Sequence, residues 1–160
     1  MTAINSNRAI RGPVTAVPVV AGKGVRLVAD TENNRWVVEA DETVLWENAA
    51  GDGAKTGITL SESCRNFEFL QISYLDNNDI YSTSKVPITA SNDTIELTTL
   101  QISTSANVMF TKSARYTLAN TSITWYKEVQ IRSDNNASTW MSDPQLKIAK
   151  VVGINRIASA

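Results

Sequence analysis

Histidine is absent from the 160-residue chain, and cysteine occurs once, as Cys64. The chain therefore lacks the commonest general base, the commonest zinc ligand and the Ser-His and Cys-His nucleophile pairs. A single cysteine also excludes an internal disulfide and a cysteine-based metal cluster. Its expected role is that of a small buried apolar side chain. The remaining candidates for chemistry are serine, lysine, carboxylate and aromatic side chains.

Two short motifs are superficially similar to motifs that enzymes use. Ser82 and Lys85 match the Ser-x-x-Lys spacing of a serine nucleophile with a lysine base. That spacing works on a helix, whereas here it lies in a strand-like run, in which residues three apart point to opposite faces. Residues 22–24, Gly-Lys-Gly, lack the Walker spacing and the helix of a phosphate-binding loop. We expect neither motif to do chemistry.

Acidic residues suggest a metal site and a glycosidase pair. Residues 76–79 are dense in carboxylates and amides, but they lack the glycine and the distant bidentate glutamate of an EF-hand loop, so a hairpin turn is favoured. Glu39, Asp41, Glu42 and Glu47 could supply the two carboxylates of a glycosidase, although alternation along strands favours solvent-facing charges. We expect no catalytic residue, metal site or cofactor. A carbohydrate-active enzyme stays open as an alternative.

The aromatic side chains divide into two groups. Those at core-like positions of alternating strands are Trp36, Trp46, Phe67 and Phe69. The second group lies near turn signals, where exposed rings can stack on sugars or anchor protein interfaces. Its candidate ligand contacts are Trp125, Tyr126 and Trp140. A place in the core stays open for each of these three.

The charge balance bears on partners. Fifteen basic and sixteen acidic residues give a net charge of −1, which offers no electrostatic footprint for nucleic acid. Near-neutral charge also does not oppose self-association. The first eight residues contain no apolar signal-peptide core, and no later run approaches membrane-spanning length. We therefore expect a protein made in the cytoplasm without a signal peptide, with no nucleic-acid partner and no membrane insertion.

The segments that contain these candidate residues have the hydrophobic pattern of β-strands. From Val25 onward, apolar residues alternate or cluster in short blocks between turn signals. Residues 31–34 tolerate a tight turn and predict a hairpin, with Val25 and Leu27 on one face of its first strand. Trp36 and Val38 share one face of its second strand.

The rest of the chain predicts one all-β fold with no helical stripe. Glycine-rich residues 49–57 are expected to form a mobile loop. Pro13 and Pro18 keep residues 1–20 from continuing as a helix. This segment is either a disordered leader or an arm that orders against a partner or a sister subunit. The expected fold is an antiparallel β-sandwich or jelly-roll-like domain, preceded by an extended N-terminal arm and a small β-hairpin collar. Its further strands are expected at residues 43–46, 58–60, 67–75, 80–86, 94–103, 108–112, 115–118, 122–131 and 146–154.

The chain has a series of short motifs at residues 21–27, 33–35, 41–47, 58–63 and 66–74. Together these motifs resemble those of small virion fibre proteins of tailed bacteriophages. In such proteins a glycine-gated strand and turn precede a leucine-tryptophan strand, a Gly/Ser/Thr loop, and a strand whose Asn-Phe-x-x-Leu pattern opens the distal β domain. The closing residues 148–158 are similar to the final strand of such chains.

The resemblance implies a non-enzymatic structural protein on the particle surface, usually a parallel homotrimer. A long repetitive shaft is absent from this chain, which favours a short head fibre or capsid decoration spike. Residues 1–20 would be the arm that anchors to the capsid or another virion protein, 21–47 the trimer collar, and 48–160 the distal sandwich. The alternative is a receptor-binding tip of a tail fibre or baseplate that binds host-surface glycans. Anchoring contacts would be Ile4, Ile10, Pro13, Val17 and Pro18, and collar contacts Val25, Leu27, Trp36 and Val38.

Overall fold

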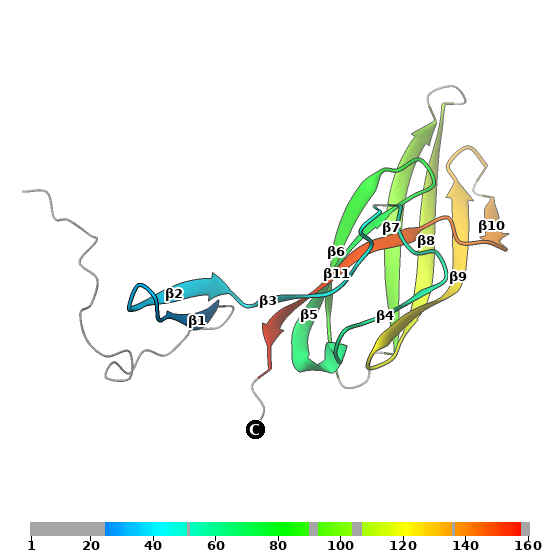
Figure 1. Ribbon diagram of the computed structural model, residues 1–160. Helices are drawn as coiled ribbons and strands as arrows, with labels where there is room; N and C mark the ends of the chain where they lie inside the picture. Colours follow the sequence, from blue (N-terminus) through cyan, green and yellow to red (C-terminus); the bar gives the residue numbers. More distant parts are fainter. Residues whose placement is uncertain (1–24, 51, 90–92, 104–106, 136, 158–160) are drawn as a thin grey trace, which may run out of the picture. The chain divides into compact units, whose positions relative to one another are not determined.

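The computed structural model describes residues 25–50, 52–89, 93–103, 107–135 and 137–157. The chain divides into two compact units, of which the first ends at Asp41 and the second begins at Glu42. The first unit contains an antiparallel hairpin of β1 (Val25–Asp30) and β2 (Arg35–Ala40), as predicted (Figure 1). Asn34 in its turn has a φ of 49°, a left-handed conformation that asparagine tolerates better than most residues.

The second unit contains two antiparallel sheets. One sheet has four strands in the order β3-β11-β5-β6. Between β4 and β5 lies η2 (Cys64–Asn66), a single 3-10 turn that is the helical element among the described residues. The strands of this sheet are β3 (Glu42–Glu47), β5 (Phe67–Leu75), β6 (Tyr81–Pro87) and β11 (Lys147–Arg156).

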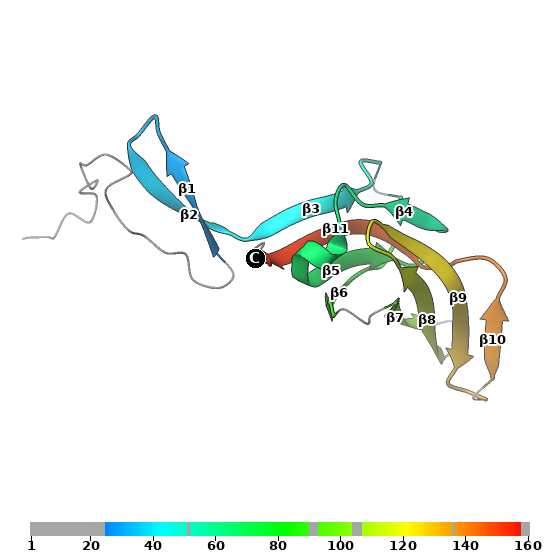
Figure 2. The same ribbon diagram turned by 90° about the horizontal axis from the view of Figure 1, so that it is seen from below.

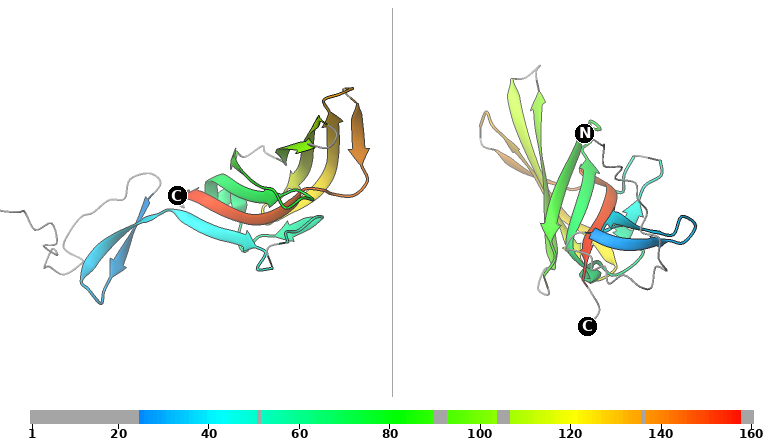
Figure 3. Two further views of the ribbon diagram at one scale, coloured as in Figure 1. Left: turned by 90° about the horizontal axis from the view of Figure 1, so that it is seen from above. Right: turned by 90° about the vertical axis from the view of Figure 1, so that its left-hand side faces the viewer.

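The other sheet has five strands, in the order β10-β9-β8-β7, with β4 also paired to β9. Figure 2 shows β9 curving along its length, so that β4 pairs with its beginning and β10 with its end. Figure 3 shows β10 beside β9 at the edge of this sheet. The strands are β4 (Gly57–Thr59), β7 (Thr94–Ser103), β8 (Val108–Leu118), β9 (Ser122–Arg132) and β10 (Ser138–Met141).

The inner faces of the two sheets form one hydrophobic core. Leu70, Ile72 and Tyr74 alternate inward along β5 and belong to the same cluster as Leu97 of β7 and Tyr116 of β8. Each of these side chains is at most 2% exposed. Burial of such large apolar surfaces is the main stabilising term of the domain. The predicted all-β, antiparallel sandwich-like fold is confirmed.

The predicted elements differ from the structure in three places. Residues 108–118 form one strand instead of two, because Ala114 points into the core, fully buried, and continues the alternation. The strand β10 was not expected. Residues 42–47, which were expected to belong to the collar, form β3, which pairs with β11 in the sandwich and places Leu45 in its core.

The predicted mobile loop at residues 49–57 is wrong in its second half, which packs against β11. The Ala54 N–H donates to the Ile148 carbonyl at 2.7 Å, and the Ile148 N–H donates back at 2.9 Å. Gly53 has a φ of 70°, and a Cβ atom there would lie 2.7 Å from the Cβ of Lys147. Glycine therefore allows a close approach of two backbones at this position.

Candidate interaction surfaces

The hairpin has one wholly apolar face. Residues directly opposite each other in an antiparallel pair project from the same side of the ribbon, and the pairs Leu27–Val38 and Ala29–Trp36 lie on this side. Val25, opposite Ala40, extends it. Val38 is 65% exposed, while Val25, Leu27 and Trp36 are half-buried. The four predicted collar residues therefore share one surface, which we call the collar face.

The opposite face of the hairpin carries two ion pairs, with the apolar pair Val28–Val37 between them. Arg26 contacts Glu39 at 2.8 Å, and Arg35 contacts Asp30 at 2.7 Å. Hydrogen bonds from Asn33, and then from Arg35, hold the pKa of Asp30 below its ordinary value. These charged pairs suit contact with water, so the hairpin is amphipathic.

The three candidate aromatic contacts separate in the structure. Arg115 on β8 lies opposite Lys127 on β9, but the next residue of β8 lies opposite Trp125, so Tyr126 is an extra residue in a β-bulge. Trp125 is half-buried and packs against the core, which is the position that the sequence left open as its alternative. Tyr126 is 60% exposed and Trp140 is 64% exposed.

Tyr126 and Trp140 flank a lysine that the sequence analysis did not single out. The ammonium of Lys127 lies 5.4 Å from the centre of the Tyr126 ring and 4.9 Å from that of Trp140. Both distances are in the range of cation–π attraction. We call these three residues the aromatic–lysine cluster. A signal for it exists in the sequence, because Lys127 directly follows the Trp125-Tyr126 pair, but the position of Trp140 depends on the pairing of β10 with β9.

The row of side chains next to this cluster is polar, and most of its members form ion pairs or hydrogen bonds with one another. Glu96 on β7 contacts Arg115 at 3.5 Å and accepts a hydrogen bond from the Ser113 hydroxyl. The Ser113 bond, and then Arg115, hold the pKa of Glu96 below its ordinary value. Thr98 donates to Ser113 at 3.3 Å, so hydroxyl groups continue the row.

The far end of the same outer face is apolar. Leu100 and Ile102 on β7 are 57% and 64% exposed, and Met109 and Ile131 are also exposed. Leu100 and Ile131 both lie opposite Thr111, and Ile102 lies opposite Met109, so these side chains form adjoining rows. The outer face of this sheet thus changes from apolar at one end to charged and aromatic at the other.

Buried polar groups on the inner side fix a loop instead of forming a site. Glu128 is fully buried, and its Oε2 accepts from the backbone N–H groups of Gln145 and Leu146 at 2.9 and 3.1 Å. Tyr116 donates its hydroxyl to the Leu146 carbonyl at 3.0 Å. Burial, followed by the charge of Glu128, raises the pKa of Tyr116. These bonds hold the segment that leads into β11.

Of the candidate motifs for chemistry, residues 22–24 lie outside the described residues, and the other two can be placed. Ser82 and Lys85 lie on β6, three residues apart, so their side chains face opposite ways as expected. Asp76 is fully buried and its Oδ1 accepts from the N–H groups of Asn78 and Ile80, which makes it a turn cap. Within the described ranges, no three acidic or cysteine side chains gather in a way that could hold a metal ion.

The carboxylates weighed as a glycosidase pair are distributed over both units. Glu39 belongs to the hairpin and pairs with Arg26. Glu47 belongs to β3 and pairs with Lys150 at 3.1 Å. Glu42 and Glu47, which belong to the same unit, are the first and last residues of β3.

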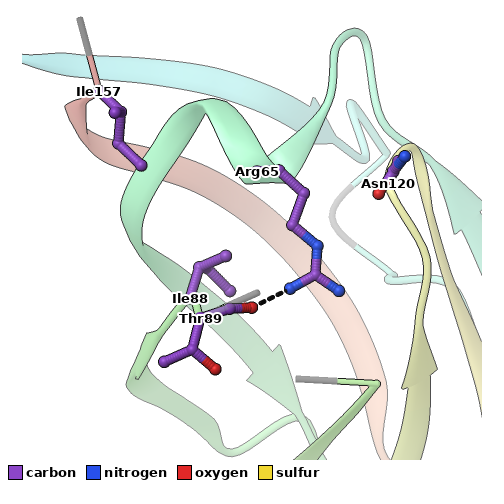
Figure 4. Close-up of a pocket in the computed structure, with 5 residues that line it drawn as sticks. All are labelled: Arg65, Ile88, Thr89, Asn120 and Ile157. Atoms are coloured by element: carbon purple, nitrogen blue, oxygen red, sulfur yellow. Dashed lines mark hydrogen bonds between the residues drawn. The ribbon is translucent and has the colours of Figure 1, made fainter. Parts of the chain in front are cut away.

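A hollow of about 400 Å³ lies at one end of the sandwich, lined by Arg65, Ile88, Thr89, Asn120 and Ile157 (Figure 4). The guanidinium of Arg65 points across it to the Thr89 carbonyl, to which it donates a hydrogen bond. Arg65 also lies 3.9 Å from Asp93. Arg65 thus joins η2 to the connection between β6 and β7.

The predicted anchoring residues Ile4, Ile10, Pro13, Val17 and Pro18 lie outside the described residues. No helix in the part of the chain that the structure describes has both the length and the apolar character needed to cross a bilayer. No family model, curated protein or solved structure matches this chain.

Proposed function

We propose that this chain is a structural protein of a tailed-bacteriophage particle, a short head fibre or decoration spike. In this proposal residues 1–20 dock on the capsid or another virion protein, and the sandwich is displayed outward. The hairpins of three copies of the chain join them into a homotrimer. The virion setting and the number of three come from the resemblance of the sequence to phage fibre proteins.

The observation that carries the proposal is the collar face. A two-stranded hairpin is at best marginally stable in water by itself. This one is part of a compact unit separate from the sandwich, and one of its faces is apolar from Val25 to Trp36. Removing such an apolar face from water stabilises the protein. In this proposal, copies of the same chain cover the face.

Imaging tests the virion role. Purified particles made with and without the gene for this chain would be compared by electron cryo-microscopy. We expect a projecting density that disappears when the gene is deleted and returns when it is supplied again. Identical particles in both preparations, together with the absence of this chain from the wild-type particles by mass spectrometry, would overturn the proposal.

A second candidate function is that of a receptor-binding tip on a tail or baseplate. The observation that favours it is the aromatic–lysine cluster, in which two exposed rings lie beside one cation. Exposed aromatic rings offer flat apolar surfaces to sugars or to protein partners. The two candidates share the hairpin assembly and differ in what the sandwich contacts.

A further inference from the structure

We propose that the aromatic–lysine cluster binds a saccharide that carries a carboxylate group, such as a uronic or sialic acid. The inference rests on the second candidate function and names its ligand class. It starts from Tyr126 and Trp140, whose rings are 60% and 64% exposed on the outer side of the sheet.

The bulge is what creates this surface. In a regular strand, residues 126 and 128 would point to the same side, and Glu128 points into the core. The register shift opposite Arg115 instead leaves Tyr126 outside, next to Lys127. Trp140 joins them because β10 places it opposite Val129, whose neighbour two positions earlier on β9 is Lys127. Bulges commonly redirect a side chain in this way beside functional sites.

Lys127 selects the charge of the ligand. Its ammonium contacts the two rings, yet it forms no ion pair with any carboxylate of the described residues. In the adjoining row, Glu96 is one acid against the two cations Arg115 and Lys127, and it is already bonded by Ser113 and Arg115. These three residues together have one positive charge more than negative, and the Lys127 ammonium lies near both rings.

The shape and the charge fit one class of ligand. The exposed rings can stack against the C–H face of a pyranose, and the Lys127 ammonium can form a charge-assisted hydrogen bond with a carboxylate on that ring. A lysine is a compact single charge, which matches one carboxylate. The Thr98 and Ser113 hydroxyls on the same outer face provide groups for sugar hydroxyls further along the chain of the saccharide.

The test is calorimetric titration of the full-length protein with two acidic probes, an oligogalacturonate and sialyllactose. Their neutral partners are the methyl ester of the same oligogalacturonate and lactose. We expect binding of at least one acidic probe, and at least about tenfold weaker binding of its neutral partner.

Three variants assign the binding to the cluster. Trp140→Ala is expected to weaken binding by at least about tenfold, and Lys127→Met to remove the preference for the acid over its neutral partner. Tyr81→Ala is the matched control, because Tyr81 is 61% exposed on β6 of the other sheet, and it should bind like the wild type. Thermal unfolding checks that each variant is folded.

Two results would overturn the inference. One is the absence of binding of both acidic probes, and the other is binding that is equal for acid and neutral partner or unchanged in folded Trp140→Ala. Either result leaves the assembly and virion proposals standing, because particle imaging and the mass of the oligomer do not involve a sugar.

Discussion

Leu27 and Val38 lie directly opposite each other in the hairpin, and their side chains project from the same face of the ribbon. Every other residue on that face is apolar as well. The reverse face contains the Arg26–Glu39 and Arg35–Asp30 ion pairs, with Val28 and Val37 between them. A small amphipathic ribbon of this kind is expected to be stable when its apolar face is covered. This relationship is the structural basis of the proposed collar.

The first prediction concerns Val38→Lys. A lysine at this position would place an ammonium in an apolar contact between chains, which costs free energy because the charge loses its hydration. We expect self-association to weaken by at least about tenfold, or about 1.4 kcal/mol. Sedimentation velocity over a concentration series measures it.

The control for this variant is Thr31→Lys, which adds the same charge in the exposed turn of the hairpin. It should assemble like the wild type. Unchanged assembly of Val38→Lys would mean that the collar face does not join the chains.

The second prediction concerns Glu62→Gln and its dependence on pH. Arg156 bonds both oxygens of Glu62, at 2.7 and 2.6 Å, and Asn66 adds a third bond. These bonds, that of Arg156 first, lower the pKa of Glu62 from 4.5 to about 2. Because the pKa is lower in the folded state, the carboxylate stabilises the fold fully above pH 4.5, and this contribution is lost as the pH falls towards 2.

We therefore expect Glu62→Gln to lower the free energy of unfolding by about 1 kcal/mol at pH 7, and the difference from wild type to shrink between pH 4.5 and pH 2. Urea unfolding at several pH values measures it. Glu47→Gln, which removes one exposed contact to Lys150, is the control and should cost less. A difference that stays constant down to the lowest pH would contradict the role of the ionised carboxylate.

The third prediction concerns Gly153→Ala in β11. A Cβ atom at this buried position would lie 2.6 Å from atoms of the Phe67 ring, which is itself fully buried. We expect a loss of about 1 to 3 kcal/mol in the free energy of unfolding, because an overpacked core must shift. Chemical denaturation measures it. Gly57→Ala, where the nearest atom would be 3.3 Å away, should cost less, and equal losses would show that the Phe67 contact is not the cause.

The fourth prediction concerns the thiol of Cys64. Its side chain is fully buried in the core cluster, and burial raises its pKa, so little of the reactive thiolate forms at neutral pH. We expect Cys64 to resist Ellman's reagent in the native protein and to react fully after unfolding in urea. Rapid stoichiometric labelling of the native protein at pH 7 would contradict this packing.

The strands could be predicted because their alternation follows directly from burial on one face. Along β5, Leu70, Ile72 and Tyr74 occupy every second position and all lie in the core. The hairpin could also be predicted, because the turn residues and the apolar positions agree with each other. The continuity of β8 could not, because Ala114 has too small a side chain to signal its place in the core.

The candidate binding surface could not be predicted from the sequence, because it depends on strand pairing between distant residues. Trp125 and Tyr126 are neighbours with similar side chains, and a bulge defined by pairing with β8 decides which of them is exposed. The position of Trp140 depends on the pairing of β10, a strand of four residues. The buried carboxylate of Glu128 accepts hydrogen bonds from two backbone N–H groups that are 17 and 18 residues away in the chain, and the sequence alone does not show this pairing.

The mass of the purified full-length protein in solution tests the central claim most directly. Multi-angle light scattering is the measurement, at protein concentrations that span the range used for Val38→Lys. The collar proposal predicts a particle of three chains of 17.5 kDa each. A mass of one chain at every concentration would contradict assembly through the collar face, and a mass of two chains would contradict the trimer.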